Sequence, residues 1–386
     1  MNIFIVNDFG LKGGGAEKRT LLLLQQMLKE GKLGEVHVIE KFSSQEKPKG
    51  KFFFYKAVDR KAESEKLFNR ILDEKKIGIV QVHNSLYLPT NFVRIAKNKN
   101  IPVVFFAHDY WPVCGWRSFI NPERFFEAES CEKSHTGIPK CAKPLTLVKL
   151  KLMQRELNNA DAGIAPSDFA VNKFSSFGLL KGKWKKVLPW INLKEFFPPA
   201  KEHREKFVLF VGSLKAYKGA FVLVNAFREI SEKFPGVQLV FAGHEEGAPL
   251  AKMKEFVNGK WLGKRVKFLG KKSEKELREL YQQAGLLVFP STCMEMFGSI
   301  WAEAMACGCP IIASDVAGMK ELAGGKVVLF ENGNSSDLQE KIIELLEDRI
   351  KASAGGKSGT GYATKSFDVR RASKEMKSIY NEISQR

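Results

Sequence analysis

Short apolar runs alternate with longer stretches of helical period along the first half of the chain. Residues 16–30 and 89–97 carry apolar side chains at helical spacing. The apolar runs, rich in β-branched and aromatic residues, cover 2–6, 36–39, 77–82, 103–107 and 162–165. Strand followed by helix, repeated, predicts a parallel sheet with helices on both faces.

The same alternation starts again in the second half. Its strand-like runs cover 207–211, 237–242, 266–269, 286–289, 310–313 and 326–329. Its helical stretches cover 220–233, 274–284, 297–306 and 336–347. The fold class predicted is therefore α/β, with two doubly wound Rossmann-like domains in series.

Breaks in the pattern suggest where the domains end. Pro189, Pro198 and Pro199 interrupt the alternation and are followed by a charged stretch typical of a linker. We expect an N-terminal domain over 1–189 and a C-terminal domain over 190–365. The Gly-rich stretch ASAGGKSGTGY at 352–362 is expected to be a loop, followed by a helix at 369–383. Residues 366–386 would then be a separate C-terminal helix, free to pack on the first domain.

Size and composition agree with two packed domains. The chain has 386 residues, more than the roughly 250–300 that one hydrophobic core usually organises. A hydrophobic fraction of 44% with 11% aromatic residues excludes a disordered chain. No run approaches the roughly 20 apolar residues of a membrane-spanning helix, and Asp8 precedes any basic residue, unlike a signal peptide. We expect a cytoplasmic protein.

Charge narrows the class of partner without identifying it. Lysine and arginine outnumber acidic residues by 62 to 43, a net charge of +19. Such an excess attracts polyanions, anionic membranes or anionic ligands.

The most informative motif, EMFGSIWAEAMACGCPIIAS, follows the predicted strand 286–289. Glu295 and Glu303 are separated by seven residues, and the turn at Phe297, Gly298 and Ser299 opens a helix between them. Bare amides at a helix N-terminus suit a phosphate or diphosphate. The two carboxylates would flank such an anion and accept hydrogen bonds from sugar and ribose hydroxyls. Glu303 could equally be an ordinary solvated helix residue.

This motif resembles the Glu-x7-Glu signature of retaining GT-B-fold glycosyltransferases of family 4, also described as glycosyl transferases group 1. The resemblance implies two Rossmann-like domains facing each other across a cleft, with the acceptor on the first and a nucleotide-sugar on the second. It implies that Glu303 binds the ribose and that Glu295 contacts the donor sugar. It also puts Met296, Phe297, Gly298 and Ser299 at the donor, where the amides after Phe297 hold the diphosphate.

Two segments of the first half add to the resemblance. Gly13, Gly14 and Gly15 let the backbone approach a ligand closely, and they resemble the GGAE element that lines the cleft under the diphosphate, near the acceptor. His108 ends a predicted strand, in a run similar to the HDYWP-x-C element of one family branch. That likeness implies a histidine beside the donor sugar, although a histidine at this place could also be structural.

The second domain carries a modified diphosphate motif. The family pattern is G-R-L-x3-K-G, and this chain keeps Gly212 and Lys218 but has Ser213 where arginine is usual. The resemblance implies that Lys218 holds the diphosphate. The loss of one cation would lower transition-state stabilisation unless Lys215 or another cation compensates. Gly243 and Lys271 resemble parts of the nucleotide pocket, with Lys271 near the base.

The expected chemistry is sugar transfer from a nucleotide-sugar, UDP- or GDP-linked, to a glycan or lipid-linked acceptor. The resemblance implies that the anomeric configuration is retained and that the leaving phosphate takes the acceptor's proton. No Asp-x-Asp follows a predicted strand, so metal-independent catalysis with no separate cofactor is expected. The catalytic candidates are His108, Lys218 and Glu295.

Weaker signals leave alternatives open. Cys131 and Cys141, with His135 between them, could bind zinc, form a disulfide or lie in a bare loop. Lysines in 143–157 and 182–187 would suit an anionic membrane surface, on the inner face where a lipid-linked acceptor lies, or simply flank an amphipathic helix.

Two other functions agree with parts of this sequence. A sugar-nucleotide 2-epimerase of the same fold would isomerise the donor without an acceptor. A nucleic-acid-binding protein would agree with the net charge, but it predicts alternating aromatic and basic residues on one face or a known reading motif. The sequence contains neither, so nucleic acid is not an expected partner.

Overall fold

The computed structural model describes residues 1–9, 11, 14–42, 48, 50–57, 61–85, 88, 91–114, 144–201, 204–243 and 248–385. They form two compact units. Unit 1 contains the described residues up to Trp190 together with those from Val369 onward, and unit 2 runs from Ile191 to Asp368. Among the helices within these ranges, none is both long and apolar enough to cross a membrane.

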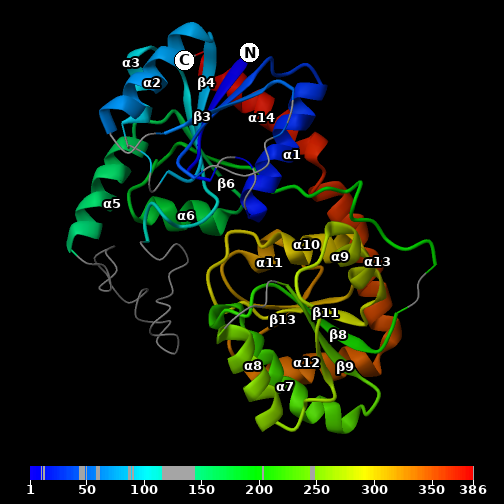
Figure 1. Ribbon diagram of the computed structural model, residues 1–386. Helices are drawn as coiled ribbons and strands as arrows, with labels where there is room; N and C mark the ends of the chain where they lie inside the picture. The colour runs from blue at the N-terminus through cyan, green and yellow to red at the C-terminus, as the bar shows by residue number, and fades with distance from the viewer. Residues whose placement is uncertain are drawn as a thin grey trace. The chain divides into compact units, whose positions relative to one another are not determined.

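Unit 1 is built on a parallel seven-stranded sheet in the order β3-β2-β1-β4-β5-β6-β7. Helices lie on both faces of this sheet (Figure 1). Its inner strand β1 has the side chains of Ile3, Phe4, Ile5 and Val6 fully buried, as a sheet covered on both faces requires. The strands are β1 (Asn2–Val6), β2 (Val36–Glu40), β3 (Phe52–Lys56), β4 (Ile77–Val82), β5 (Val103–Phe106), β6 (Ala162–Ala165) and β7 (Trp184–Lys186). The helices are α1 (Gly15–Lys29), α2 (Lys61–Glu74), α3 (Phe92–Asn98), α5 (Pro144–Leu157), α6 (Asp168–Ser176) and α14 (Val369–Ser384).

The C-terminal helix α14 is part of unit 1, far in sequence from the rest of it. Its buried residues Ala372, Met376, Tyr380 and Ile383 recur at helical spacing and join the core that holds Leu24 of α1. The amphipathic pattern of this segment therefore predicted the helix correctly.

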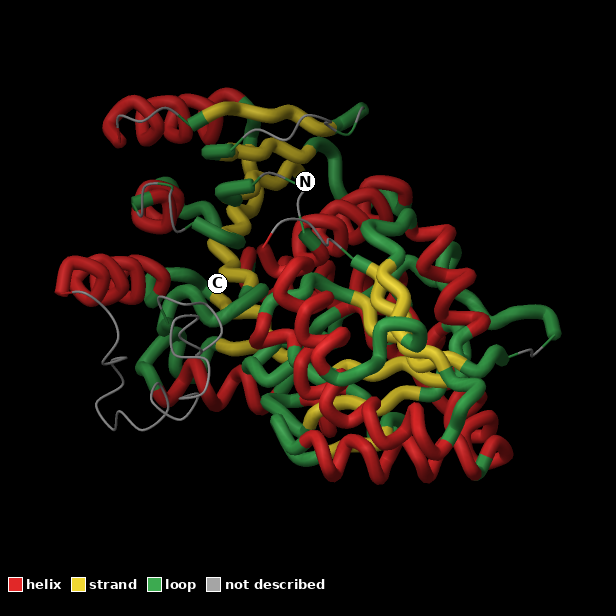
Figure 2. The backbone as a smooth tube through the Cα atoms, turned by 60° about the horizontal axis from the view of Figure 1, so that its bottom comes forward, coloured by secondary structure: helices red, strands yellow, loops and turns green. Residues whose placement is uncertain are grey.

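Unit 2 is built on a parallel six-stranded sheet in the order β10-β9-β8-β11-β12-β13. Strands again form an inner layer with helices around it (Figure 2). Its strands are β8 (Phe207–Val211), β9 (Gln238–Ala242), β10 (Val266–Phe268), β11 (Leu286–Phe289), β12 (Ile311–Ser314) and β13 (Val328–Phe330). Its helices are α7 (Ala220–Lys233), α8 (Ala248–Gly259), α9 (Glu274–Gln283), α10 (Ser299–Ala306), α11 (Met319–Leu322), α12 (Ser335–Glu347) and α13 (Arg349–Ser366), with a 3-10 turn η1 at Ala216–Lys218.

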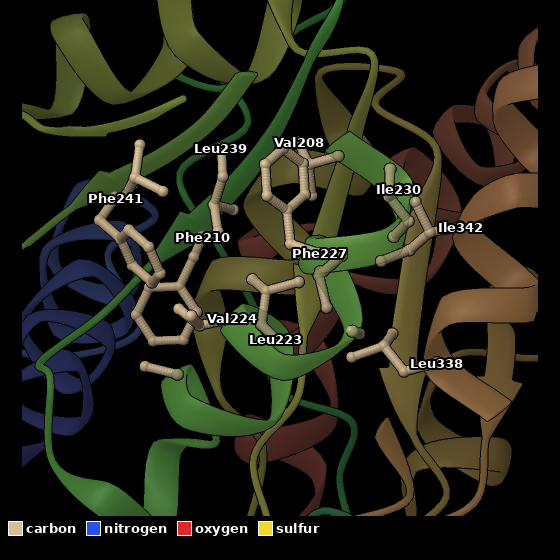
Figure 3. Packing of buried hydrophobic residues seen from close by; sticks show 14 of the residues in the cluster. Val208, Phe210, Leu223, Val224, Phe227, Ile230, Leu239, Phe241, Leu338 and Ile342 are labelled. Atoms are coloured by element: carbon tan, nitrogen blue, oxygen red, sulfur yellow. The ribbon is translucent and has the colours of Figure 1, made fainter. Parts of the chain in front are cut away.

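The core of unit 2 shows why its helices cover the sheet. Phe210 of β8 and Leu239 of β9 pack against Leu223 and Phe227 of α7, and Leu338 of α12 joins the same cluster (Figure 3). All five are at most 2% exposed. The expected α/β class with two doubly wound domains is confirmed by these two sheets.

The expected loop at 352–362 is wrong, because α13 runs through it from Arg349 to Ser366. Its glycines serve close helix packing rather than flexibility. A Cβ on Gly356 would lie 2.2 Å from the carbonyl oxygen of Gly308, and one on Gly359 would lie 3.0 Å from Met305. Only glycine lets α13 lie so close to the end of α10, so local composition misled the prediction.

Candidate functional site

In each sheet the order of strands reverses beside the first strand of the unit. Strand β1 lies between β2 and β4, and β8 lies between β9 and β11. Loops at the carboxyl ends of such strand pairs form the usual ligand sites of doubly wound sheets. The Gly14 segment follows β1 and Lys218 follows β8, so both motifs lie at these switch points.

At the switch point of unit 2, Lys218 and Glu295 form an ion pair. Lys218 Nζ lies 2.8 Å from Glu295 Oε1, and their side chains are only 28% and 15% exposed. Ser291 donates a hydrogen bond of 2.6 Å to the same carboxylate oxygen. Burial of Lys218 acts to lower its pKa, but the Glu295 carboxylate outweighs it, so the pKa is raised. Lys218 is therefore held as a cation at neutral pH.

The two loops that carry this pair are tied to each other. The carbonyl oxygen of Tyr217 accepts a backbone hydrogen bond of 2.9 Å from Thr292. It also accepts a hydrogen bond of 3.2 Å from the Thr292 hydroxyl, and the Ser291 hydroxyl oxygen lies 3.4 Å from it. Gly219 has a φ of +75°, and a Cβ there would lie 1.8 Å from the carbonyl oxygen of Pro290. Glycine thus lets the loops approach closely enough to fix the pair.

Gly298 directs the chain from Glu295 into α10. Its φ is +68°, and a Cβ there would lie 2.6 Å from the ring of Phe289 and 3.1 Å from Glu295 Oε2. The amide end of α10, which begins at Ser299, is therefore next to the Lys218–Glu295 pair. Amides at a helix start, together with an ammonium group, form an environment suited to an anion.

The side chains of Met296 and Phe297 are buried in unit 2, 6% and 2% exposed. Phe297 stacks edge-on against Trp301 and Phe367, with ring centroids 5.1 and 5.5 Å apart. These residues anchor the turn, so any contact they make with a ligand comes from their backbone.

Glu303 lies on α10 and contacts Tyr281 of α9. The Tyr281 hydroxyl donates a hydrogen bond of 3.3 Å to Glu303 Oε2. Burial, with the Glu303 charge beside it, holds the pKa of Tyr281 well above its ordinary value. The tyrosine therefore keeps the proton that it shares with Glu303.

The remaining residues expected at the donor lie along the same edge of the unit 2 sheet. Gly212 donates its amide to Ala242 and Gly243 donates to Gly270, each at 2.9 Å. A Cβ on Gly243 would lie 2.1 Å from the carbonyl oxygen of Gly212. Ser213 is half-buried next to Gly212, and Lys271 is exposed next to Gly270.

A second cation stands near Lys218. Lys215 Nζ and Lys218 Nζ lie 5.9 and 5.6 Å from the centre of the Tyr217 ring. Lys215 is exposed, so its ammonium group has no burial to overcome on reaching an anion. The loop that lacks arginine at Ser213 therefore carries two lysines around one aromatic ring.

In unit 1, Gly14 precedes α1 and Gly15 is its first residue. Glu17, in the first turn, is 6% exposed and accepts a 3.5 Å hydrogen bond from Asn84, which follows β4. Gly13 lies outside the described residues, as do Cys131, Cys141 and His135. Within the described ranges, no group of three or more His, Cys, Asp and Glu side chains could hold a metal.

His108 is the end of a buried hydrogen-bonded chain. Its Nε2 lies 2.6 Å from Nδ1 of His83, whose Nε2 lies 2.9 Å from Oε1 of Gln81. Gln81 in turn donates to the hydroxyl of Tyr380 on α14. The His83 and His108 rings are nearly parallel, at 16° to each other, with centroids 4.9 Å apart. Burial lowers the pKa of His83 to about 3 and that of His108 well below its usual value, so both rings are neutral at pH 7.

Sequence reasoning missed several residues of these sites. His83 follows a predicted strand just as His108 does, so its position alone could have identified it. Ser291 and Tyr217 adjoin recognised motifs, but nothing in the sequence shows that they join the two loops. Tyr380 is 299 residues from Gln81 in the sequence, and only folding brings them together.

Two family models match the chain. Glycosyltransferase Family 4 matches residues 13–195, and Glycosyl transferases group 1 matches residues 192–361. An uncharacterized glycosyltransferase of Methanocaldococcus jannaschii is 31% identical over 180 residues, which cover 46% of this chain and 48% of that protein. A D-inositol 3-phosphate glycosyltransferase of Corynebacterium jeikeium is 30% identical over 187 residues, covering 47% of this chain and 44% of that protein. The chain thus spans about half the length of these curated relatives.

The fold has close counterparts among solved structures. HepE of Anabaena, in a crystal structure in complex with UDP, superposes with a TM-score of 0.77 at 18% identity, covering 99% of this chain and 100% of that one. At that identity the likeness speaks for the fold alone. Matching family models over both halves and this two-sheet architecture lead to one conclusion: the chain belongs to the GT-B glycosyltransferases of family 4 and group 1.

Proposed function

We propose that this protein transfers a hexosyl group from a nucleotide-sugar, UDP- or GDP-linked, to a glycan or lipid-linked acceptor with retention of configuration. The observation that carries the proposal is the Lys218–Glu295 pair beside the amide end of α10, at the switch point of the unit 2 sheet. A diphosphate needs a cation and amide donors, and a sugar needs a carboxylate acceptor. This arrangement offers all three within one pair of tied loops.

In the proposed reaction the bond between the anomeric carbon and the diphosphate oxygen breaks as an acceptor hydroxyl approaches from the same face of the sugar. The new bond joins the acceptor oxygen to the anomeric carbon, and the acceptor's proton passes to a phosphate oxygen of the leaving nucleotide. Lys218 and the amides after Phe297 stabilise the charge that develops on that diphosphate. No metal ion or separate cofactor takes part in this scheme.

Glu295 has two tasks in this proposal. It keeps Lys218 charged and in place, as its 2.8 Å contact indicates, and its second oxygen accepts a hydrogen bond from the donor sugar. Glu303 accepts hydrogen bonds from the ribose, with Tyr281 fixing its orientation. Gly212, Gly243 and the backbone beside Lys271 form the wall for the nucleotide.

Lys215 is proposed to replace the arginine of the G-R-L-x3-K-G pattern, where this chain has Ser213. Its ammonium group shares the Tyr217 ring with Lys218 and is exposed. A flexible lysine can contribute charge to a diphosphate but lacks the two parallel donors of a guanidinium group. We therefore expect transfer to proceed with a less tightly held leaving group.

His108, with Gly14 and Gly15, is proposed to serve the reacting sugar and acceptor from unit 1. The neutral imidazole would exchange a hydrogen bond with a sugar hydroxyl, and the backbone carbonyl would stabilise positive charge at the anomeric carbon. We further propose a cytoplasmic enzyme peripheral to the inner face of the membrane, where a lipid-linked acceptor would be available.

A thermal-shift screen of UDP-, GDP- and ADP-sugars tests the donor site. A ligand at about 100 times its dissociation constant stabilises the folded state by about 2.7 kcal/mol, a measurable rise in Tm. The rise should disappear in Glu303→Ala. The stabilising donor is then incubated with and without acceptor and the products identified. Transfer to an acceptor supports the proposal, whereas isomerised nucleotide-sugar without acceptor would show the 2-epimerase instead.

A further inference from the structure

The loop that follows α8 exposes a large aromatic side chain on unit 2. Trp261 is 93% exposed, more than any other large hydrophobic residue among those described. We use the name Trp261 surface for the exposed or half-buried residues of this loop, Lys260, Trp261, Lys264 and Arg265.

The backbone at Trp261 would suit glycine better than tryptophan. Leu262 donates its amide to Val257 at 3.1 Å and Trp261 donates to Asn258 at 2.9 Å, which is the Schellman arrangement at a helix end. Trp261 occupies its left-handed position with a φ of 60°. Glycine is favoured there because it has no Cβ to strain. Neither backbone preference nor burial accounts for an indole at this place.

The chain around this loop is strongly basic. Residues 249–273 contain seven lysines and one arginine but a single carboxylate, Glu255. Lys252, Lys254, Lys264 and Lys267 are exposed. This segment therefore carries a large share of the chain's net charge of +19 around one exposed tryptophan.

The basic segment at 182–187, expected from the sequence to suit a membrane, is committed to the fold instead. Trp184 is half-buried in the edge strand β7 and stacks on Phe174 with centroids 4.8 Å apart. Lys185 pairs with Glu382 at 2.9 Å, and Lys186 pairs with Asp168 at 2.5 Å. Two of its three lysines are thus paired with carboxylates of unit 1.

We propose that the Trp261 surface docks unit 2 on an anionic lipid bilayer. An indole prefers the boundary between headgroups and acyl chains, and lysines flanking it reach lipid phosphates with their apolar stems along the surface. Charge complementarity to anionic headgroups strengthens the binding with each lysine or arginine near the surface.

A bilayer fits this surface better than a nucleic acid does. Single-stranded nucleic acids bind several aromatic side chains, one for each stacked base. On the Trp261 surface Trp261 is the one aromatic side chain, and the neighbouring Phe256 and Phe268 pack against the unit 2 core. One indole ringed by cations matches an interfacial anchor.

The test is co-sedimentation of the full chain with phosphatidylcholine vesicles that contain or lack about 30% phosphatidylglycerol. The salt concentration is about 0.1 M, at which the Debye length is about 10 Å. We expect binding to the anionic vesicles and little to the neutral ones. Trp261→Gly should weaken binding by about tenfold or more, because an interfacial indole is lost. The variant K260E/K264E/R265E should weaken it by about 100-fold or more.

Trp261→Gly also separates binding from folding. Glycine fits the left-handed backbone, so its Tm should equal or exceed that of the parent chain. Ile350→Ser is the matched control for exposure, since Ile350 is 85% exposed elsewhere in unit 2. K320E/K326E/K365E is the control for charge, because it makes the same change at three other exposed lysines.

Binding that ignores vesicle charge, or falls equally in the controls, would overturn the proposal. So would single-stranded RNA binding that the two loop variants abolish while vesicles are not bound. The measurement does not depend on sugar transfer, so its outcome leaves the proposed activity to be judged separately.

Discussion

His83 Nδ1 lies 2.6 Å from His108 Nε2, and this contact sets which nitrogen of His108 carries the proton. Gln81 donates its amide to Tyr380, so its oxygen accepts from Nε2 of His83. Nδ1 of His83 is then an acceptor, and Nε2 of His108 must donate to it. His108 is left with Nδ1 as an acceptor. The hydrogen-bonding role of His108, a residue proposed to act on the sugar, is thereby linked through His83 and Gln81 to a tyrosine on the C-terminal helix.

Replacing His83 with phenylalanine should impair catalysis without weakening the donor site of unit 2. The variant keeps a ring to stack on Phe106 but removes both nitrogens. A misplaced His108 should lower kcat by about 10- to 100-fold, with the KM for the donor nearly unchanged.

The nitrogen-15 NMR chemical shifts of the His108 ring show which nitrogen is protonated. Simple destabilisation of the fold would not change them. We expect the parent chain to show protonation at Nε2 and the variant to show a mixture. Phe106→Leu, which removes a stacking partner but keeps the hydrogen bonds, is the control. Parental kcat together with unchanged shifts in His83→Phe would contradict this role.

The buried histidines should make stability fall in mild acid. The pKa of His83 is lowered to about 3 by burial, whereas an unfolded histidine titrates near about 6.5. Between those values the unfolded chain binds a proton that the folded chain does not, so the free energy of unfolding decreases as pH falls. One such histidine contributes a loss of about 1.4 kcal/mol for each pH unit below about 6.5.

Urea unfolding at pH 7 and about pH 5.5 measures this effect. Other groups titrate as well, so the difference between the parent chain and His83→Phe is the informative quantity. The variant should lose less stability on acidification. An equal loss in both chains would mean that His83 is protonated in the folded state.

Lys218→Met and Glu295→Ala should both abolish most donor turnover. Removal of a charge that stabilises the leaving diphosphate typically costs about 100- to 1000-fold in kcat. Glu295→Ala removes the sugar contact and also leaves Lys218 without the carboxylate 2.8 Å away. Lys233→Met is a control, because Lys233 pairs with Glu347 in the same unit at 2.6 Å, outside the proposed site. Near-normal turnover in both site variants would refute the assignment.

Ser213→Arg should leave donor hydrolysis unchanged or make it faster. It introduces the arginine of the G-R-L-x3-K-G pattern that this loop resembles, on the same loop as Lys218. If Lys215 compensates at present, Lys215→Met should slow the parent chain more than it slows Ser213→Arg. A large loss of hydrolysis in Ser213→Arg would instead give the serine a role of its own.

Gly356→Ala should destabilise unit 2, whereas Gly355→Ala should not. A Cβ at 356 meets the carbonyl oxygen of Gly308 at 2.2 Å, and one at 355 meets nothing within 4 Å. We expect a loss of about 1–3 kcal/mol for the first from overpacking. The second should gain about 0.5–1 kcal/mol from better helix propensity. Equal effects in chemical denaturation would mean that α13 does not pack on α10 as described.

The sequence was sufficient for the architecture because a sheet covered on both faces needs continuous apolar strands. The runs at 2–6 and 207–211 are of this kind, and they became the inner strands β1 and β8. The local relationship between Glu295 and Glu303 could likewise be predicted, because only one turn and the start of one helix separate them. Short edge strands such as β3 and β7 were missed because half-buried sequence carries a weaker signal.

Tertiary structure decided what depends on contacts between distant segments. The glycines of α13 resemble a linker until α10 is placed against them, because a close approach of two helices leaves no local trace in the sequence. Lys218 and Glu295 are 77 residues apart, and only the pairing of β8 with β11 makes them one site. His83 and His108 acquire their roles in the same way, through a hydrogen-bonded chain that ends on the last helix. Residue types and local periodicity thus determined most helices and strands, whereas tertiary packing determined which partners each functional side chain contacts.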